Sequence, residues 1–267
     1  MAAPGSAHPQ TDGSLPREET ATLLPEDAFI PFNTLLYWIL KLFPVGILVQ
    51  EAGDLIRAAE SVVAAQLGIT TTQYRGTTCN DVTIIFARGT GEAGNVGVLV
   101  GPELFDAVLA RLSGTSATLA VQGVNYAADV SGFLLANRCK SPSPLMSHRW
   151  LTSQCFRAND VTQVLSFCPK TNIVMAGYSQ GGQLVHNAVN LMSLVSQYRI
   201  SSVVIFGDPN YPAPVDGVAL ARQLVICHGN DIICGRGDMV LLPHLTYAQD
   251  VGQAADFIVG NLWRTDV

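Results

Sequence analysis

The sequence predicts one doubly wound α/β domain, and two observations support this fold class. Beyond residue 79, short runs rich in valine and isoleucine alternate with segments that have apolar residues at helical spacing. The short runs lack the apolar–polar alternation of half-exposed strands, so they suit parallel strands that are buried on both faces. Strands and helices that alternate in this way form a single parallel sheet between layers of helices.

The expected elements follow one another regularly along the chain. Strands are predicted over residues 82–87, 117–122, 172–176, 202–206 and 223–227. Helices are predicted over residues 98–112, 157–166, 180–198 and 246–262. No internal repeat or linker divides this part of the chain, so we expect residues 79–267 to fold as one domain.

The residues that precede this domain differ from it in composition. Residues 1–28 are rich in Pro, Gly, Ser, Thr and Glu, which predicts a mobile tail. Residues 29–49 change abruptly to an apolar composition. The apolar stretch within them, residues 35–49, is shorter than the roughly 20 residues that cross a bilayer, so no transmembrane segment is expected. Residues 51–67 have helical spacing. We expect residues 29–78 to be a helical extension, which either forms a flap over the site or covers a face of the sheet.

Composition and charge exclude several classes of function. Only 13% of the 267 residues are charged, and the formal net charge is −6. The chain has no basic stripe of the kind that binds nucleic acid or anionic lipid, so neither is expected as a partner. A chain of this length buries enough core to fold without a metal or cofactor. We expect a neutral, poorly charged substrate.

The six cysteines indicate an oxidising compartment. None forms a C-x-x-C pair, so no zinc site is expected, whereas three disulfides would use every thiol. The alternative is six separate buried thiols. We therefore expect secretion, and because residues 1–26 lack the pattern of a signal peptide, Met1 is interpreted as a mature or recombinant start. The connectivity stays open at this point.

A G-x-S-x-G motif over residues 177–181 contains a candidate nucleophile, Ser179. The motif follows a predicted strand and precedes an amphipathic helix. A sharp turn between them would hold Ser179 in a strained conformation at the C-terminal edge of the sheet. The alternative is a glycine-rich turn that contains a serine without a chemical role.

Such a serine is a poor nucleophile until a base and an orienting acid activate it. The candidate base is His244, and Asp208 and Asp231 both satisfy the order Ser–Asp–His of α/β-hydrolases. Cys227 and Cys234 flank Asp231 closely enough for a small ring, which would fix its carboxylate. We therefore favour Asp231 and interpret Asp208 as a structural turn residue.

Several motifs in this order resemble the cutinase family of serine esterases, which is related to the acetylxylan esterases. They lie at Cys79, Arg88–Glu92, Cys168–Pro169, Gly177–Gly182, Phe206–Pro209, Cys227–Cys234 and His244–Tyr247. The resemblance covers about residues 79–260. It implies a cutinase-like α/β-hydrolase fold, with a five-stranded parallel sheet flanked by helices.

The resemblance also implies the roles of individual residues. The implied catalytic triad is Ser179, Asp231 and His244. The implied oxyanion hole consists of the backbone N–H groups of Thr90 and Gln180. The implied disulfides are Cys79–Cys168 and Cys227–Cys234, which leave Cys139 and Cys155 as a third pair.

An apolar loop formed by Val240, Leu241 and Leu242 precedes the candidate base and suits an acyl chain or polyester surface. The alternative is ordinary loop packing. We expect a secreted, monomeric serine esterase that hydrolyses esters of cutin, polyester or lipid type through an acyl-enzyme, without metal or cofactor. The alternatives are an acetylxylan esterase or lipase and, in another class, a non-catalytic protein that binds lipid or wax surfaces on a hydrolase fold.

Overall fold

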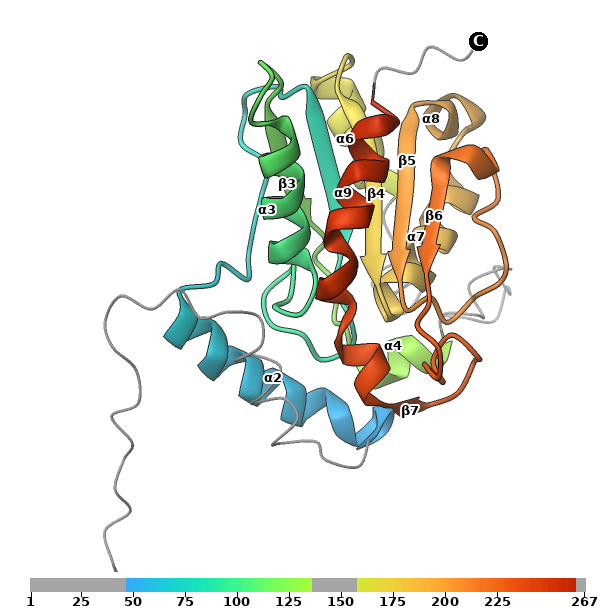
Figure 1. The fold of residues 1–267 in the computed structure, drawn as a ribbon. Coiled ribbons are helices and arrows are strands. Elements are labelled where there is room, and N and C mark those ends of the chain that lie inside the picture. Colours follow the sequence, from blue (N-terminus) through green and yellow to red (C-terminus); the bar gives the residue numbers. More distant parts are fainter. Residues whose placement is uncertain (1–46, 136–157, 263–267) are drawn as a thin grey trace, which may run out of the picture.

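The computed structural model describes residues 47–135 and 158–262 (Figure 1). The predicted tail over residues 1–28 lies outside the described residues, as do Cys139 and Cys155. The expectations for these parts of the chain therefore stay predictions.

A five-stranded parallel sheet forms the centre of the molecule, in the order β3-β2-β4-β5-β6. Its strands are β2 (Val82–Ala87), β3 (Leu119–Gly123), β4 (Asn172–Tyr178), β5 (Ile200–Phe206) and β6 (Gln223–Ile226). The predicted sheet is confirmed. Every residue of β2 is buried, and β4 and β5 each have only one position that is not. This burial explains why their sequences are continuous apolar runs.

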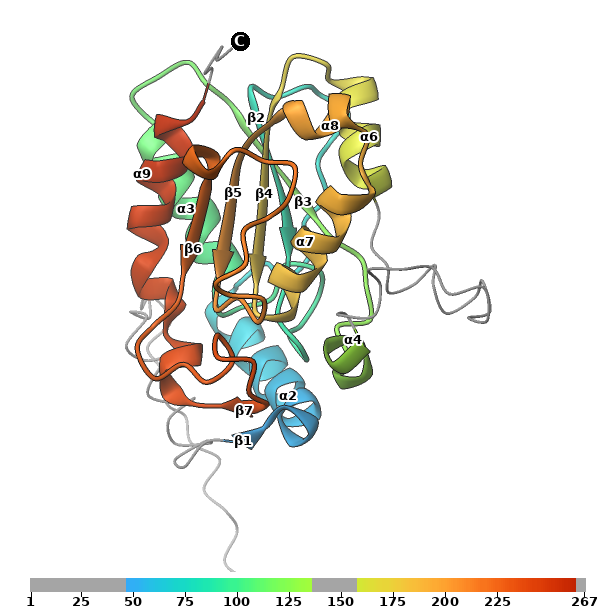
Figure 2. The same cartoon turned by 90° about the vertical axis from the view of Figure 1, so that its right-hand side faces the viewer.

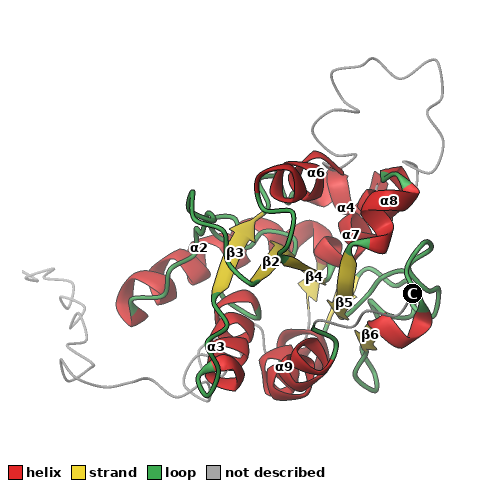
Figure 3. Cartoon of the chain, turned by 90° about the horizontal axis from the view of Figure 1, so that it is seen from above, coloured by secondary structure: helices red, strands yellow, loops and turns green. Residues whose placement is uncertain are grey.

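Helices cover both faces of the sheet. One face carries α3 (Gly101–Leu112) and α9 (Val251–Gly260). The other carries α6 (Ala158–Phe167), α7 (Gln180–Leu191) and α8 (Leu194–Tyr198) (Figures 2 and 3). Each helical layer buries an apolar cluster against its face of the sheet. The two layers therefore enclose the sheet and leave its strand ends as the place for a site.

Some helix boundaries differ from the prediction. The helix predicted over residues 180–198 breaks at Met192, whose extended backbone separates α7 from α8. The helix predicted over residues 246–262 begins only at α9, because a 3₁₀ turn over Tyr247–Asp250 precedes it. The short helix α4 (Val130–Leu135) was not predicted.

The described part of the N-terminal extension lies at the carboxyl ends of the central strands. Helix α2 (Val49–Leu67) ends at Gly68, which is left-handed, and crosses this end of the sheet (Figure 1). Before it, β1 (Ile47–Leu48) pairs antiparallel with β7 (Met239–Val240). Among the helices of the described ranges, none is both long and apolar enough to span a bilayer.

Candidate active site

The turn between β4 and α7 holds Ser179 in the conformation that its motif predicts. Ser179 has φ 56° and ψ −120°, a region that non-glycine residues rarely adopt. Two close approaches require glycine here. A Cβ on Gly177 would lie 2.5 Å from the backbone of Gly181, and one on Gly181 would lie 1.9 Å from the carbonyl oxygen of Ala87. The turn therefore projects Ser179 beyond the carboxyl end of the sheet.

The structure brings Ser179, His244 and Asp231 together in one hydrogen-bonded chain. His244 Nε2 lies 2.9 Å from Ser179 Oγ, and His244 Nδ1 lies 2.8 Å from Asp231 Oδ2. All three residues are buried, with 2–6% of their surface exposed. Because a carboxylate only accepts, Nδ1 carries the proton and Nε2 of the neutral ring is free to accept from the serine hydroxyl. This tautomer is the one a general base needs.

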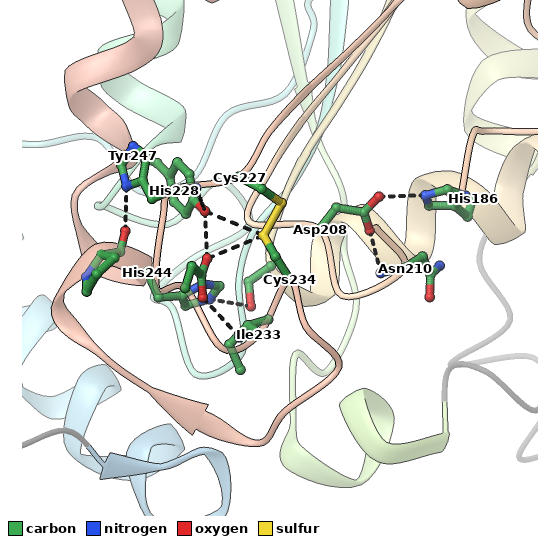
Figure 4. The surroundings of a disulfide bond; sticks show 12 residues. His186, Asp208, Asn210, Cys227, His228, Ile233, Cys234, His244 and Tyr247 are labelled. Atoms are coloured by element: carbon green, nitrogen blue, oxygen red, sulfur yellow. Dashed lines mark hydrogen bonds and ion pairs between the residues drawn. A yellow bond between two sulfur atoms is a disulfide. The ribbon is translucent and has the colours of Figure 1, made fainter. Parts of the chain in front are cut away.

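The second candidate acid, Asp208, lies in a different environment. It is fully buried, and its carboxylate lies 2.8 Å from His186 Nε2 and accepts from the backbone N–H of Asn210. Figure 4 shows this pair apart from His244. Asp208 thus fixes the turn after β5 to helix α7, as a structural turn residue would.

The loop that holds Asp231 is closed by the Cys227–Cys234 disulfide (Figure 4). The same carboxylate oxygen that faces His244 also accepts a 2.6 Å hydrogen bond from Tyr247 Oη. Burial raises the pKa of Tyr247 well above its usual value, so its hydroxyl stays protonated and donates. Tyr247 belongs to a motif noted in the sequence, but a tyrosine three residues after a histidine carries no signal of this contact.

The oxyanion-loop residues Thr90 and Gln180 are also neighbours. Thr90 Oγ1 donates to the side-chain oxygen of Gln180 over 3.0 Å, and Gln180 Nε2 donates to the carbonyl of Asp129 over 3.1 Å. The N–H of Gln180 is the first of α7, and N–H groups in the first turn have no acceptor within the helix. The arrangement therefore holds the Thr90 loop beside the positive end of the helix.

Two buried charged residues of the same loop, Arg88 and Glu92, were not assigned a role from the sequence. Arg88 donates to the carbonyls of Glu92 and Tyr126, over 2.8 and 2.9 Å. Glu92 accepts three backbone N–H groups, from Gly89, Val98 and Leu99. Burial raises the pKa of Glu92, while these N–H groups and Arg88 oppose the shift. A dense internal network thus shapes the loop on which Thr90 lies.

Of the three residues of the predicted substrate loop, Val240 is the most deeply buried. Its side chain is buried in the apolar core, and its backbone pairs with Ile47 of the extension. This burial supports the alternative of ordinary packing for Val240, and a contact between this loop and substrate stays a prediction. Leu241 is half-buried, whereas 43% of Leu242 is exposed.

The predicted disulfides between Cys79 and Cys168 and between Cys227 and Cys234 are present. Cys139 and Cys155 are not among the described residues. Within residues 47–135 and 158–262, no group of three or more His, Cys, Asp or Glu side chains is arranged to hold a metal ion.

Comparisons with known proteins agree on one family. The Cutinase family profile matches residues 78–262. A cutinase of Hypocrea jecorina (strain QM6a) is 43% identical over 227 residues, 85% of this chain and 85% of that protein. A cutinase of Botryotinia fuckeliana is 45% identical over 198 residues, 74% of this chain and 89% of that protein. A solved structure of Trichoderma reesei cutinase, in complex with a C11Y4 phosphonate inhibitor, matches with a TM-score of 0.71 and 40% identity, over 86% of this chain and 99% of that chain.

Proposed function

This chain belongs to the cutinase family and is a carboxylic-ester hydrolase, and we propose that Ser179, His244 and Asp231 carry out the hydrolysis through an acyl-enzyme. The observation that supports the proposal most directly is the unbroken hydrogen-bonded chain from Ser179 Oγ through the ring of His244 to Asp231. The strained backbone of Ser179 is a second support, since it is typical of a nucleophile at a strand–helix turn.

In the proposed reaction, Ser179 Oγ attacks the ester carbonyl while His244 Nε2 takes its proton. The tetrahedral intermediate then collapses to the acyl-enzyme, and His244 returns the proton to the leaving alcohol. A water molecule, deprotonated by His244, attacks the acyl-enzyme; the bond from the acyl carbon to Ser179 Oγ then breaks, His244 returns the proton to Oγ, and the acid is released. Asp231 keeps Nδ1 protonated and stabilises the imidazolium. The backbone N–H groups of Thr90 and Gln180 would donate to the oxyanion, which lowers the barrier by several kcal/mol.

Exposed apolar side chains around the carboxyl end of the sheet support a substrate of cutin, polyester or lipid type. They come from β1, α4, the Asp231 loop, β7 and the turn before His244, and are Leu48, Leu134, Ile232, Met239 and Leu242. An apolar rim of this kind favours an acyl chain or polymer surface over a sugar ester. We also propose secretion, which the two disulfides support because disulfides persist in oxidising compartments.

We further propose that the extension forms a flap at the mouth of the site, ahead of a catalytic domain over residues 79–267. Two contacts support it. Strand β1 pairs with β7, four residues before His244. Helix α2 lies at the carboxyl end of the sheet (Figure 1), and its Glu60 Oε2 accepts a 3.1 Å hydrogen bond from the backbone N–H of Ala93, in the loop that follows Thr90.

The proposal is tested by labelling with a serine-reactive phosphonate; the Trichoderma reesei cutinase structure contains a phosphonate inhibitor. We expect a single adduct at Ser179 in mass spectra of the digested protein, together with loss of ester hydrolysis. Ser179→Ala should take up no adduct and lose at least about 10³-fold in kcat. Full activity of Ser179→Ala would refute the proposed nucleophile. A folded wild-type protein that forms no adduct would favour the non-catalytic, surface-binding alternative.

The same preparation distinguishes the alternative esterases. We expect hydrolysis of butyryl and longer acyl esters and of insoluble polyester, in preference to acetylated xylan. A preference for acetylated xylan would support an acetylxylan esterase. Hydrolysis confined to long-chain triacylglycerol would support a lipase.

A further inference from the structure

The loop that carries His244 is bound by a second histidine, His228, which lies outside the triad (Figure 4). The Nδ1 atom of His228 lies 2.7 Å from the carbonyl oxygen of Pro243, the residue directly before His244. Its Nε2 atom lies 2.7 Å from Asp250 Oδ2, at the start of α9. One imidazole thus connects the chain before His244 to the chain after it.

The chemistry of these contacts fixes the protons of His228. A carbonyl oxygen only accepts hydrogen bonds, so Nδ1 donates to Pro243. The carboxylate of Asp250 also accepts, so Nε2 donates as well. Both ring nitrogens of His228 are thus engaged, one by a backbone carbonyl and the other by a carboxylate. Thr246 Oγ1 donates to the same carbonyl of Pro243 over 3.2 Å, so this oxygen has two donors.

The bond to Pro243 acts on the peptide plane that leads into His244. This plane contains the carbonyl of Pro243 and the N–H of His244, and the N–H in turn donates to the carbonyl of Leu241 over 2.9 Å. A planar peptide that is held on both sides cannot rotate. The direction in which the His244 side chain leaves the backbone is therefore fixed.

The backbone of His228 reaches the other end of the triad. Its N–H donates to Tyr247 Oη over 3.0 Å, and the two rings stack with centroids 4.1 Å apart. Because Tyr247 Oη accepts there, its own proton is directed toward Asp231, 2.6 Å away. His228 thus contacts both the carbonyl of Pro243, which precedes His244, and the hydroxyl of Tyr247, which donates to Asp231.

We infer that His228 is a positioning residue, which holds His244 in register with Ser179 through its hydrogen bond to the carbonyl of Pro243. This inference rests on the proposed function, since it assigns His228 a part in the same reaction. His228 does not touch the substrate or the reacting atoms. Its loss should therefore reduce kcat and leave KM almost unchanged.

Three substitutions of His228 distinguish the effect of its bond to Pro243 from that of its bond to Asp250. In His228→Asn the amide nitrogen takes the place of Nδ1 and keeps the bond to Pro243, whereas in His228→Gln it takes the place of Nε2 and keeps the bond to Asp250. His228→Phe loses both bonds and keeps the stacking on Tyr247. On a soluble butyryl ester we expect His228→Asn to stay within about threefold of the wild-type kcat. His228→Gln and His228→Phe should lose roughly 10- to 100-fold, with KM changed by less than about twofold.

His186→Asn is the control, because it removes another histidine–carboxylate contact, at 2.8 Å from Asp208, away from the His244 loop. We expect it to lower Tm and to leave kcat unchanged at temperatures well below that Tm. Equal kcat in His228→Asn and His228→Gln, or a loss in His228→Gln no larger than in His186→Asn, would overturn the inference. If His228→Phe does not fold, the Asn–Gln comparison still decides. Activity of Ser179→Ala tests the proposed function separately, whatever the His228 variants show.

Discussion

Asp231 accepts hydrogen bonds on both carboxylate oxygens, and these bonds decide its charge. One oxygen accepts the N–H of Ile233 over 3.0 Å, and the other accepts from His244 and Tyr247. Burial alone would raise the pKa of Asp231. The hydrogen bond from His244 and its electrostatic attraction, followed by the bonds from Tyr247 and Ile233, outweigh burial and hold the pKa of Asp231 below its usual value. Asp231 is thus ionised at neutral pH.

The Tyr247→Phe substitution tests this balance. Removing a 2.6 Å bond to a carboxylate should lower the free energy of unfolding at pH 7 by about 1.5–3 kcal/mol. Because the folded-state pKa of Asp231 lies below the unfolded value, the stabilisation is complete above about pH 4 and is lost as the pH falls through the folded pKa. The difference between variant and wild type should therefore narrow by pH 3. Urea unfolding at both pH values measures it, and an equal difference at both would contradict the assignment.

The residues of the proposed triad could be selected from the sequence because their chemistry restricts residue type, order and local motif. Ser179 needs a strand–helix turn flanked by glycines, and Asp231 lies between two cysteines. His228 and Tyr247 had no comparable signal. Their hydrogen-bond partners lie 15–22 residues away in the sequence. These contacts therefore form only when the segment after β7 folds back against the loop after β6.

Helix α2 docks on the loop of Thr90 through a buried carboxyl group, that of Glu60. Glu60 is 4% exposed, and its Oε2 atom accepts the N–H of Ala93 over 3.1 Å. Its other oxygen is buried without a hydrogen-bond partner in the described structure. Burial, then the negative charge of Glu92, raise the pKa of Glu60 well above its usual value, and the hydrogen bond from Ala93 and the guanidinium of Arg88 offset this only in part. Docking therefore favours a neutral Glu60.

We predict that docking of α2 weakens as the pH rises and that Glu60→Gln removes this dependence. Since the docked pKa of Glu60 is raised, its contribution is complete below the usual pKa of about 4.3 and is lost as the pH rises through the raised value. Glutamine cannot ionise. Tryptic cleavage after Arg57, exposed on α2, measures opening of the helix, with the rate normalised to an unstructured peptide at each pH.

As the pH is raised above about 4.3, the normalised cleavage rate should rise in the wild type and stay level in Glu60→Gln. Ser61→Ala, which alters the next, exposed residue of the same helix, is the control and should behave as the wild type. The same pH dependence in wild type and Glu60→Gln would show that Glu60 does not govern docking.

The elements that could be predicted are those with enough residues to show a period. Strands β2, β4 and β5 are continuous apolar runs, and α2 has a clear apolar face with a glycine stop. Strands β1 and β7 have only two residues each, too few to show any pattern. Their pairing joins segments nearly 200 residues apart in sequence, so only the folded chain defines them.

The two described disulfides lie at opposite ends of the parallel sheet. Cys79 and Cys168 lie before β2 and β4, at the amino ends of the strands, and close a segment of 89 residues. Cys227 and Cys234 lie after β6, at the carboxyl ends, and are separated by seven residues. A disulfide that closes a longer segment removes more entropy from the unfolded chain. The longer link should therefore govern global stability, whereas the shorter link holds the loop of Asp231.

We therefore expect removal of the Cys79–Cys168 disulfide to cost more stability, and removal of the Cys227–Cys234 disulfide to cost more activity. Replacing Cys79 and Cys168 by alanine should lower the free energy of unfolding by about 4.5 kcal/mol, against about 2.4 kcal/mol for Cys227 and Cys234, because the entropy scales with the logarithm of segment length. The kcat on a butyryl ester should fall at least about tenfold in the Cys227/Cys234 variant, since Asp231 loses its closed loop, and less than about twofold in the other. Denaturant unfolding and kinetics under non-reducing conditions measure both quantities. A larger loss of kcat in the Cys79/Cys168 variant, assayed where both variants are folded, would mean that the shorter ring does not position Asp231.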